Sequence, residues 1–277
     1  MKAQVFAATL TPFDFLGRVD LAQLAEHIRW LESHGIQGFA PTGTTGEFLY
    51  LNWEERRAIH HTVLEAADKA PVVPCVWDPE PHRAVALAMH AADEGAKAVF
   101  LPPPLFHVVD ESVILRWYEA LVEGCPIPVW AYHHPRTHNP IAPGLFTKLV
   151  GLGVRALKDS SGQPARVHAL CHDHPGKIWL GGEAMLPRLE MLTGACGHIS
   201  RLANLYPRFV VRVAGESLGV HANRLLQLER IIKSMGGLPA VKARLGMGCR
   251  LPLEGPPDMD LSLLPDPGFP GQALALP

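Results

Sequence analysis

Four side chains in this sequence are of types that could perform covalent chemistry on a carbonyl compound. Lys158 and Tyr132 each follow a short apolar run, and Thr44 and Thr45 stand in a glycine-flanked turn that begins at Gly43. An amine in apolar surroundings has a lowered pKa, and the neutral amine can attack a ketone to form a Schiff base. A phenol can move protons beside such an imine, and turn N–H groups with hydroxyls can bind a carboxylate. The residue types predict imine chemistry on a 2-keto acid.

Each of these residues also has a simpler interpretation. A lone lysine near a strand end is usually a solvated surface residue, a tyrosine in an apolar run is usually part of the core, and a G-T-T-G segment is often only a tight turn. The chemical interpretation therefore depends on whether the fold brings the three segments to one place.

Eight short apolar runs alternate with amphipathic segments of helical period, which favours a parallel sheet. Most runs lack polar alternation, as expected of strands buried on both faces. We predict a closed (β/α)8 TIM barrel, in which the carboxyl ends of the strands form the active site. The predicted strands are residues 5–9, 36–40, 72–76, 98–101, 128–131, 154–157, 178–180 and 196–199.

Helix boundaries are indicated by capping residues. Asp20 with Gln23, and Asn52 with Glu55, have the spacing of a capping box, and Asp110 is a candidate N-cap of a further helix.

A weak repeat supports the same alternation. The glycines Gly35, Gly95, Gly153 and Gly194 each stand before a predicted strand. Glycine suits the left-handed position that ends a helix.

The chain is expected to divide into three parts. Residues 1–217 would form the barrel, residues 218–250 a helical extension packed on it, and residues 251–277 a proline-rich tail. Candidate helices near the end cover residues 206–217, 219–234 and 238–247.

Composition excludes several classes of protein. The 277 residues carry a formal net charge of −2 without blocks of like charge, so neither nucleic acid nor a membrane is expected as a partner. The five cysteines are scattered, which argues against a disulfide framework. We find no G-x-G-x-x-G after the first strand, no signal peptide and no long apolar span, and we expect a cytoplasmic protein.

The fifteen histidines raise the alternative of a metal site. His168 and His172 have helical spacing that zinc could use. No carboxylate in a metal-type motif accompanies them, so we expect no metal. Glu47, in the turn, is expected to fix the backbone by hydrogen bonding rather than to act as an acid.

Between about residues 5 and 207, the sequence resembles the dihydrodipicolinate synthase / N-acetylneuraminate lyase family of class I aldolases. The resemblance is carried by Thr11-Pro12-Phe13 with Gly17 and Asp20, the G-T-T-G-E run of residues 43–47, Leu51 with residues 54–56, Tyr132 with Pro135, Lys158 with residues 159–162, and residues 197–200 with Asn204 and Pro207.

The resemblance implies a role for each site residue. Lys158 would be the Schiff-base lysine, Tyr132 the proton shuttle, and Thr44 and Thr45 the carboxylate-binding pair, with Thr44 also in a hydroxyl relay. Ile199 stands where the family has a backbone carbonyl near the pyruvyl group. The resemblance further implies pyruvate or a related 2-keto acid with an aldehyde as substrates, no cofactor beyond the lysine, and a homo-oligomer, either a dimer or a tetramer.

Three positions depart from the synthase pattern. Leu105 stands where synthases have a second tyrosine, His133 replaces an asparagine, and Arg136 is about one residue early for the arginine that binds the second substrate's carboxylate. His133 and Arg136 remain candidate substrate-binding residues. These departures put true dihydrodipicolinate synthase activity in question. A 2-keto sugar-acid dehydratase acting through the same imine, and a non-catalytic keto-acid-binding barrel, stay open as alternatives.

Overall fold

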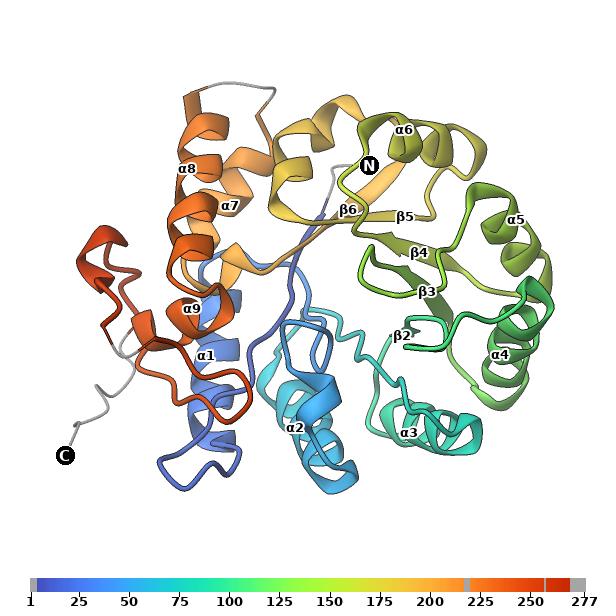
Figure 1. The fold of residues 1–277 in the computed structure, drawn as a ribbon, viewed down its shortest axis with the longest axis horizontal. Helices are drawn as coiled ribbons and strands as arrows, with labels where there is room; N and C mark the ends of the chain where they lie inside the picture. Colours follow the sequence, from blue (N-terminus) through green and yellow to red (C-terminus); the bar gives the residue numbers. More distant parts are fainter. Residues whose placement is uncertain (1–3, 217–219, 257, 270–277) are drawn as a thin grey trace.

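Six parallel strands form one curled sheet with helices on its outside (Figure 1). The computed structural model describes residues 4–216, 220–256 and 258–269. The strands lie in the order β1-β6-β5-β4-β3-β2. They are β1 (Gln4–Ala7), β2 (Val99–Leu101), β3 (Val129–His133), β4 (Ala156–Asp159), β5 (Ile178–Gly181) and β6 (Ala195–Ser200).

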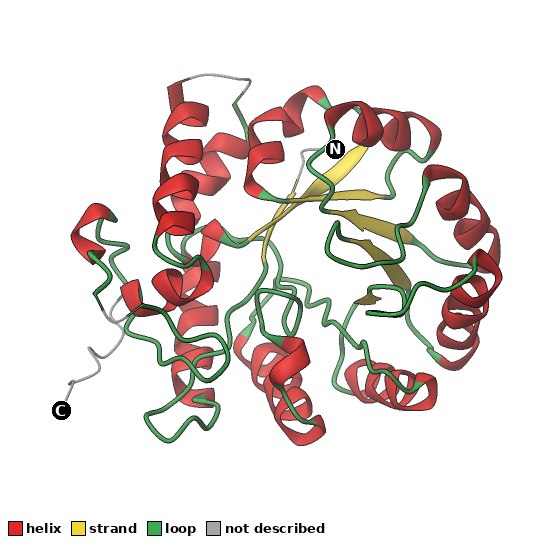
Figure 2. Cartoon of the chain, viewed as in Figure 1, coloured by secondary structure: helices red, strands yellow, loops and turns green. Residues whose placement is uncertain are grey.

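Segments 36–40 and 72–76 close the ring between β1 and β2 without forming regular strands (Figure 2). Phe39 forms isolated parallel bridges to Ala7 and Val72, and Cys75 bridges to Phe100. The predicted barrel is confirmed, but two of its eight strands are reduced to single bridges. Proline interrupts the third segment at residue 74 and follows the second at residue 41, and it cannot donate to a ladder.

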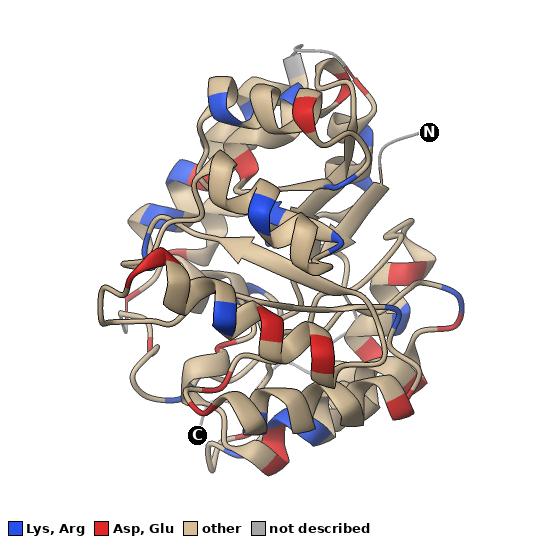
Figure 3. Ribbon diagram, turned by 90° about the vertical axis from the view of Figure 1, so that its right-hand side faces the viewer, with Lys and Arg blue, Asp and Glu red and all other residues tan. Residues whose placement is uncertain are grey.

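Helices surround the barrel on its outer side (Figure 1). They are α1 (Leu21–Ser33), α2 (Trp53–Ala66), α3 (Pro81–Asp93), α4 (Glu111–Gly124), α5 (Pro143–Leu152), α6 (Pro164–Asp173), α7 (Pro207–Ala214), α8 (Val220–Ser234) and α9 (Leu238–Arg244). Short 3-10 segments are η1 (Phe48–Tyr50), η2 (Glu183–Met191), η3 (Leu202–Asn204) and η4 (Leu261–Leu263). Acidic and basic residues are interspersed over the helices seen in Figure 3.

The predicted helix caps differ in outcome. Asn52 and Glu55 form a complete capping box, with both hydrogen bonds at 2.8 Å. The Asp20 side chain accepts from the Gln23 N–H at 2.9 Å. The Gln23 side chain does not complete the capping box, because its amide donates to the Gly246 carbonyl. Asp110 stands at the N-cap of α4, as predicted, although its side chain makes no capping hydrogen bond.

The four repeat glycines have the backbone conformation that the sequence indicated. Gly35, Gly95, Gly153 and Gly194 have φ between +92° and +112°. This left-handed region is accessible to glycine at little cost, which explains the repeat.

Two apolar layers hold the barrel together. The larger lies between the sheet and the helices. The smaller fills the inside of the barrel and includes Phe6, Phe100, Tyr132, Trp179 and Ile199. The inner layer packs beneath the polar side chains at the carboxyl ends of the strands.

Helices α8 and α9 follow the barrel along the chain (Figure 1). The His221 ring of α8 lies 6.0 Å from the Phe209 ring of α7, and the Gln23 side chain of α1 donates to the Gly246 carbonyl, just after α9, at 3.1 Å. The chain after α9 packs on the protein as well, because Leu264 is buried and Tyr206 donates to the Pro265 carbonyl at 2.9 Å. The three-part division stays a prediction. Its boundary at residues 217–218 and the end of the tail, residues 270–277, lie outside the described residues. No helix in the described ranges has both the length and the apolar character needed to cross a membrane.

A buried histidine of α1 predicts a loss of stability in acid. His27 is fully buried, its Nε2 lies 3.0 Å from the Asn204 carbonyl oxygen, and burial lowers its pKa from 6.5 to about 4. Between these pH values the unfolded chain binds a proton that the folded protein does not. The contribution of neutral His27 to the free energy of unfolding is therefore fully present above about pH 6.5 and is lost as the pH falls towards 4.

We expect the free energy of unfolding to fall between pH 7 and pH 5 by about 2 kcal/mol more in wild type than in His27→Gln. Urea unfolding at the two pH values measures this difference. His172→Gln, at an exposed position of α6, is the control and should behave as wild type. Equal losses in wild type and His27→Gln would contradict the assignment.

Candidate active site

The amine of Lys158 lies inside the barrel, against aromatic rings. Lys158 in β4 pairs in register with Tyr132 of β3 and with Trp179 of β5. Its Nζ is 4.2 Å from the centre of the Tyr132 ring and 4.9 Å from that of Phe100. Only 5% of the residue is exposed. Asp159, the next residue, pairs instead with Arg166 at 2.8 Å, so the strand directs its amine and its carboxylate to opposite faces.

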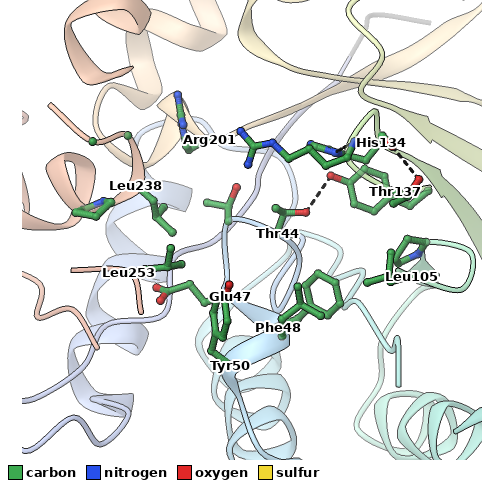
Figure 4. Close-up of a pocket in the computed structure, with 18 of the residues that line it drawn as sticks. Thr44, Glu47, Phe48, Tyr50, Leu105, His134, Thr137, Arg201, Leu238 and Leu253 are labelled. Carbon is green, nitrogen blue, oxygen red and sulfur yellow. Dashed lines mark hydrogen bonds between the residues drawn. The ribbon is translucent and has the colours of Figure 1, made fainter. Parts of the chain in front are cut away.

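The turn of residues 43–47 follows segment 36–40 and reaches Tyr132 of β3 across the mouth of the barrel, past segment 72–76 and β2. The Thr44 hydroxyl and the Tyr132 hydroxyl share a hydrogen bond of 3.1 Å (Figure 4). Gly46 is required for the shape of the turn, because a Cβ there would lie 2.8 Å from the Thr42 nitrogen. Lys158, Tyr132 and Thr44 thus form a continuous line of contacts from three separate segments.

Glu47 ends the turn in a left-handed conformation, with φ of 62°. Its carboxylate accepts from Lys242 of α9 at 2.7 Å, and each side chain is only 1% exposed. Burial raises the pKa of Glu47, and the cation of Lys242 opposes that shift. Burial lowers the pKa of Lys242, opposed in turn by Glu47. A carboxylate held in this way fixes the backbone, in agreement with the structural role expected of Glu47.

A cavity of about 640 Å³ opens above this line of contacts. Thr44, Thr45, Tyr132 and Arg136 line it, as does Leu105 at the position where a second tyrosine was missing (Figure 4). The amine of Lys158 does not line the cavity itself. It contacts the ring of Tyr132, which does.

Gly43 and Ile199 stand at the edge of the site. Gly43 adjoins the inner layer, because a Cβ there would be 3.1 Å from the Phe100 ring. Ile199 of β6 belongs to the same buried inner layer as Tyr132. Neither is among the residues that line the cavity.

His133 is not brought to the cavity. It follows Tyr132 in the same strand and therefore faces outward, where its Nδ1 accepts from the Ile141 N–H at 3.2 Å. His134, the next residue, lines the cavity instead. Burial, followed by the charge of Arg136, lowers the pKa of His134 to about 4. The ring at the cavity is therefore neutral at pH 7.

Several lining residues were not found from the sequence. Arg201 lines the cavity and directly follows β6. Lys158 was predicted because it lies at the end of a strand, and the same criterion applied to β6 would have identified Arg201. Its Nη2 donates to Glu229 of α8 at 2.6 Å. No sequence pattern indicated the remaining lining residues. Those of the barrel are Phe48, Leu49, Tyr50, Pro102 and Thr137, and those of the C-terminal part are Lys233, Gly236, Gly237, Leu238, Pro239 and Leu253.

Within the ranges that the structure describes, no three His, Cys, Asp or Glu side chains gather as a metal site. The helical histidines make other contacts: His172 lies 3.0 Å from Asp173 and His174 lies 3.0 Å from the Thr147 hydroxyl.

Comparison with known proteins adds independent evidence. Residues 1–243 match the model of the dihydrodipicolinate synthetase family. A 4-hydroxy-tetrahydrodipicolinate synthase of Methanothrix thermoacetophila is 31% identical over 230 residues, covering 81% of this chain and 77% of that protein. An uncharacterised DapA-like lyase of Halobacterium salinarum is 28% identical over 276 residues, covering 94% of this chain and 91% of that protein.

Solved structures agree with the fold. The 4-hydroxy-tetrahydrodipicolinate synthase of Methylacidiphilum fumariolicum superposes with a TM-score of 0.83 at 25% identity, covering 94% of this chain and 93% of that one. The sialic acid aldolase of Ruminococcus gnavus has a TM-score of 0.86 at 19% identity, covering 95% and 94%, and supports the fold alone. The chain belongs to the dihydrodipicolinate synthetase family, and it is a lyase of that family.

Proposed function

We propose that this lyase is a pyruvate-dependent class I aldolase in which Lys158 forms a Schiff base with a 2-keto acid. The observation that carries the proposal is the continuous contact from the Lys158 amine to Tyr132 and on to the Thr44 hydroxyl. A lysine amine beside a phenol that can move protons is suited to nucleophilic attack on a ketone.

The reaction follows from these groups. The Lys158 nitrogen attacks the ketone carbon, and loss of water gives a protonated imine. When the bond between the carbons α and β to the imine breaks, its electron pair forms the enamine double bond and the C=N π pair moves to nitrogen. The hydroxyl on the β-carbon loses its proton, and that carbon becomes the carbonyl carbon of an aldehyde. Tyr132, hydrogen-bonded to Thr44, is the acid and base that carries this proton. Protonation of the enamine and hydrolysis then release the keto acid and the free amine.

Binding of the keto acid is assigned to the turn. Thr44, Thr45 and the backbone at Gly43 offer hydroxyl and N–H donors for its carboxylate, and the Ile199 carbonyl is proposed to face the pyruvyl group. Arg136 lines the same cavity and is a candidate to bind a carboxylate of the second substrate. No cofactor is needed, since the lysine itself is the electron sink once it is an imine.

The apolar side chain at position 105 is the reason that two other functions stay open. An apolar side chain lines the cavity where the synthases have a relay phenol. A 2-keto sugar-acid dehydratase would use the same imine without that relay, and a keto-acid sensor would form the imine without turnover.

The assembly is also a proposal. The loop after β2 exposes Phe106 at 78% and Val108 at 77%, which supports self-association as a dimer or tetramer. A cytoplasmic location stays a prediction.

Reductive trapping tests the proposed Schiff base. After addition of pyruvate and borohydride, intact-mass analysis of wild type should show one reduced pyruvyl adduct, which should be absent in Lys158→Ala. Lys69→Met removes an exposed lysine and is the control, which should label as wild type. Failure of folded wild type to form an adduct would contradict the proposal.

The products then separate the three functions. An aldolase releases pyruvate from a hydroxy-keto acid, a dehydratase releases water without pyruvate, and a sensor is trapped by borohydride but turns over none of the substrates.

Removal of the phenol should affect turnover more than imine formation. In Tyr132→Phe we expect kcat to fall by roughly 10²- to 10⁴-fold, because the proton carrier is lost. Steady-state kinetics with the substrate found above gives kcat, and borohydride trapping reports the imine. Tyr118→Phe is the matched control, since Tyr118 is also buried but belongs to the outer apolar layer, where its hydroxyl donates to the Leu101 carbonyl at 2.8 Å. Equal kcat values in the two variants would exclude Tyr132 as the proton carrier.

A further inference from the structure

We propose that Lys242 is a positioning residue of the active site, which acts through Glu47 on the turn that holds Thr44 and Thr45. By this inference the C-terminal helix α9 is part of the site rather than a layer added outside the barrel. The inference rests on the proposed function, since it concerns the turn to which the keto-acid carboxylate is assigned.

The ion pair between Glu47 and Lys242 is almost fully buried, although Glu47 is one of the residues that line the cavity. Its two charged atoms are 2.7 Å apart, and each side chain is 1% exposed. A buried charge that loses its partner is strongly unfavourable, so each side chain fixes the other's position. The barrel turn is thereby tied to a residue of α9.

The position of Glu47 controls the backbone of Thr44. The Glu47 N–H donates to the Thr44 carbonyl at 3.3 Å, and the Tyr50 N–H donates to the Glu47 carbonyl at 2.9 Å. The strained left-handed backbone of Glu47 persists only if surrounding contacts hold it. A rotation there would move the Thr44 peptide and with it the hydroxyl that bonds Tyr132.

Other contacts attach the same C-terminal segment to the barrel. The Lys242 amine and the Arg250 guanidinium each lie 4.3 Å from the centre of the Phe13 ring. The Phe13 N–H donates to the Gly248 carbonyl at 3.3 Å, and Arg250 pairs with Glu55 at 2.6 Å. Loss of the charge on Lys242 therefore leaves the segment attached, and the effect on the turn can be measured separately.

The segment also forms one wall of the cavity. Leu238 and Leu253 lie on the side opposite Leu105, with the Thr44 turn between them (Figure 4). A shift of the turn relative to this wall would change the space available to the substrate carboxylate.

The test measures how borohydride trapping on Lys158 depends on pyruvate concentration, in Lys242→Met, Glu47→Gln and the double variant. We expect the half-saturating concentration of pyruvate to rise roughly tenfold in Lys242→Met, about the effect of one lost hydrogen bond to the carboxylate. The trapping rate at saturation should stay near wild type, because the amine itself is untouched. Lys242→Arg keeps the cation and should restore most of the affinity.

The double variant separates stability from positioning. It removes both buried charges, so its melting temperature should exceed that of either single variant. The half-saturating concentration of pyruvate for the double variant should nevertheless stay above that of wild type. Arg56→Met is the matched control, because it breaks another buried ion pair, to Asp78 at 2.6 Å, and should lower the melting temperature without changing the affinity for pyruvate.

Two results would overturn the inference. One is a wild-type half-saturating concentration of pyruvate in Lys242→Met. The other is a rise of that concentration in Arg56→Met as large as the rise in Lys242→Met. If wild type forms no adduct, the proposed function fails, and crystal structures of wild type and Lys242→Met then decide the positioning role by themselves. An unchanged Thr44–Tyr132 separation would overturn it, and a lengthened one would support it.

Discussion

The register between β3 and β4 determines where the amine of Lys158 lies. Tyr132 and Lys158 are direct partners in this parallel pair, so both side chains face the inside of the barrel. A shift of one residue would turn Lys158 towards the helices and bring Asp159 inward. The buried aromatic floor, the hydrogen bond from Tyr132 to Thr44 and the cavity above them all depend on this single alignment.

Sequence patterns located the parts of the site that follow from the barrel rule. Lys158, Tyr132 and the threonine turn were found because each follows a strand, and the carboxyl ends of parallel strands meet at one face. His133 was assigned to the cavity without regard to alternation along β3, which directs it outward. Segments 36–40 and 72–76 were expected to be full strands, but the prolines next to or within them reduce them to bridges.

The C-terminal contribution could not be predicted in the same way. Lys242 lies in the short helix α9, and no local pattern indicates that its partner is Glu47. Such a contact depends on how α9 docks on the finished barrel. The tertiary structure thus joins a motif that is recognisable in the sequence to one that is not.

The distance along the chain between Glu47 and Lys242 has a consequence for biosynthesis. The two residues are 195 positions apart. At ordinary translation speeds Glu47 is synthesised roughly 10 to 40 s before its partner. During that interval the nascent barrel contains a carboxylate that must remain solvated or protonated, and the turn lacks the contact that Lys242 provides. The turn is therefore among the first parts of the site to be synthesised and the last to be completed. A chain that the ribosome releases before Lys242 lacks this contact.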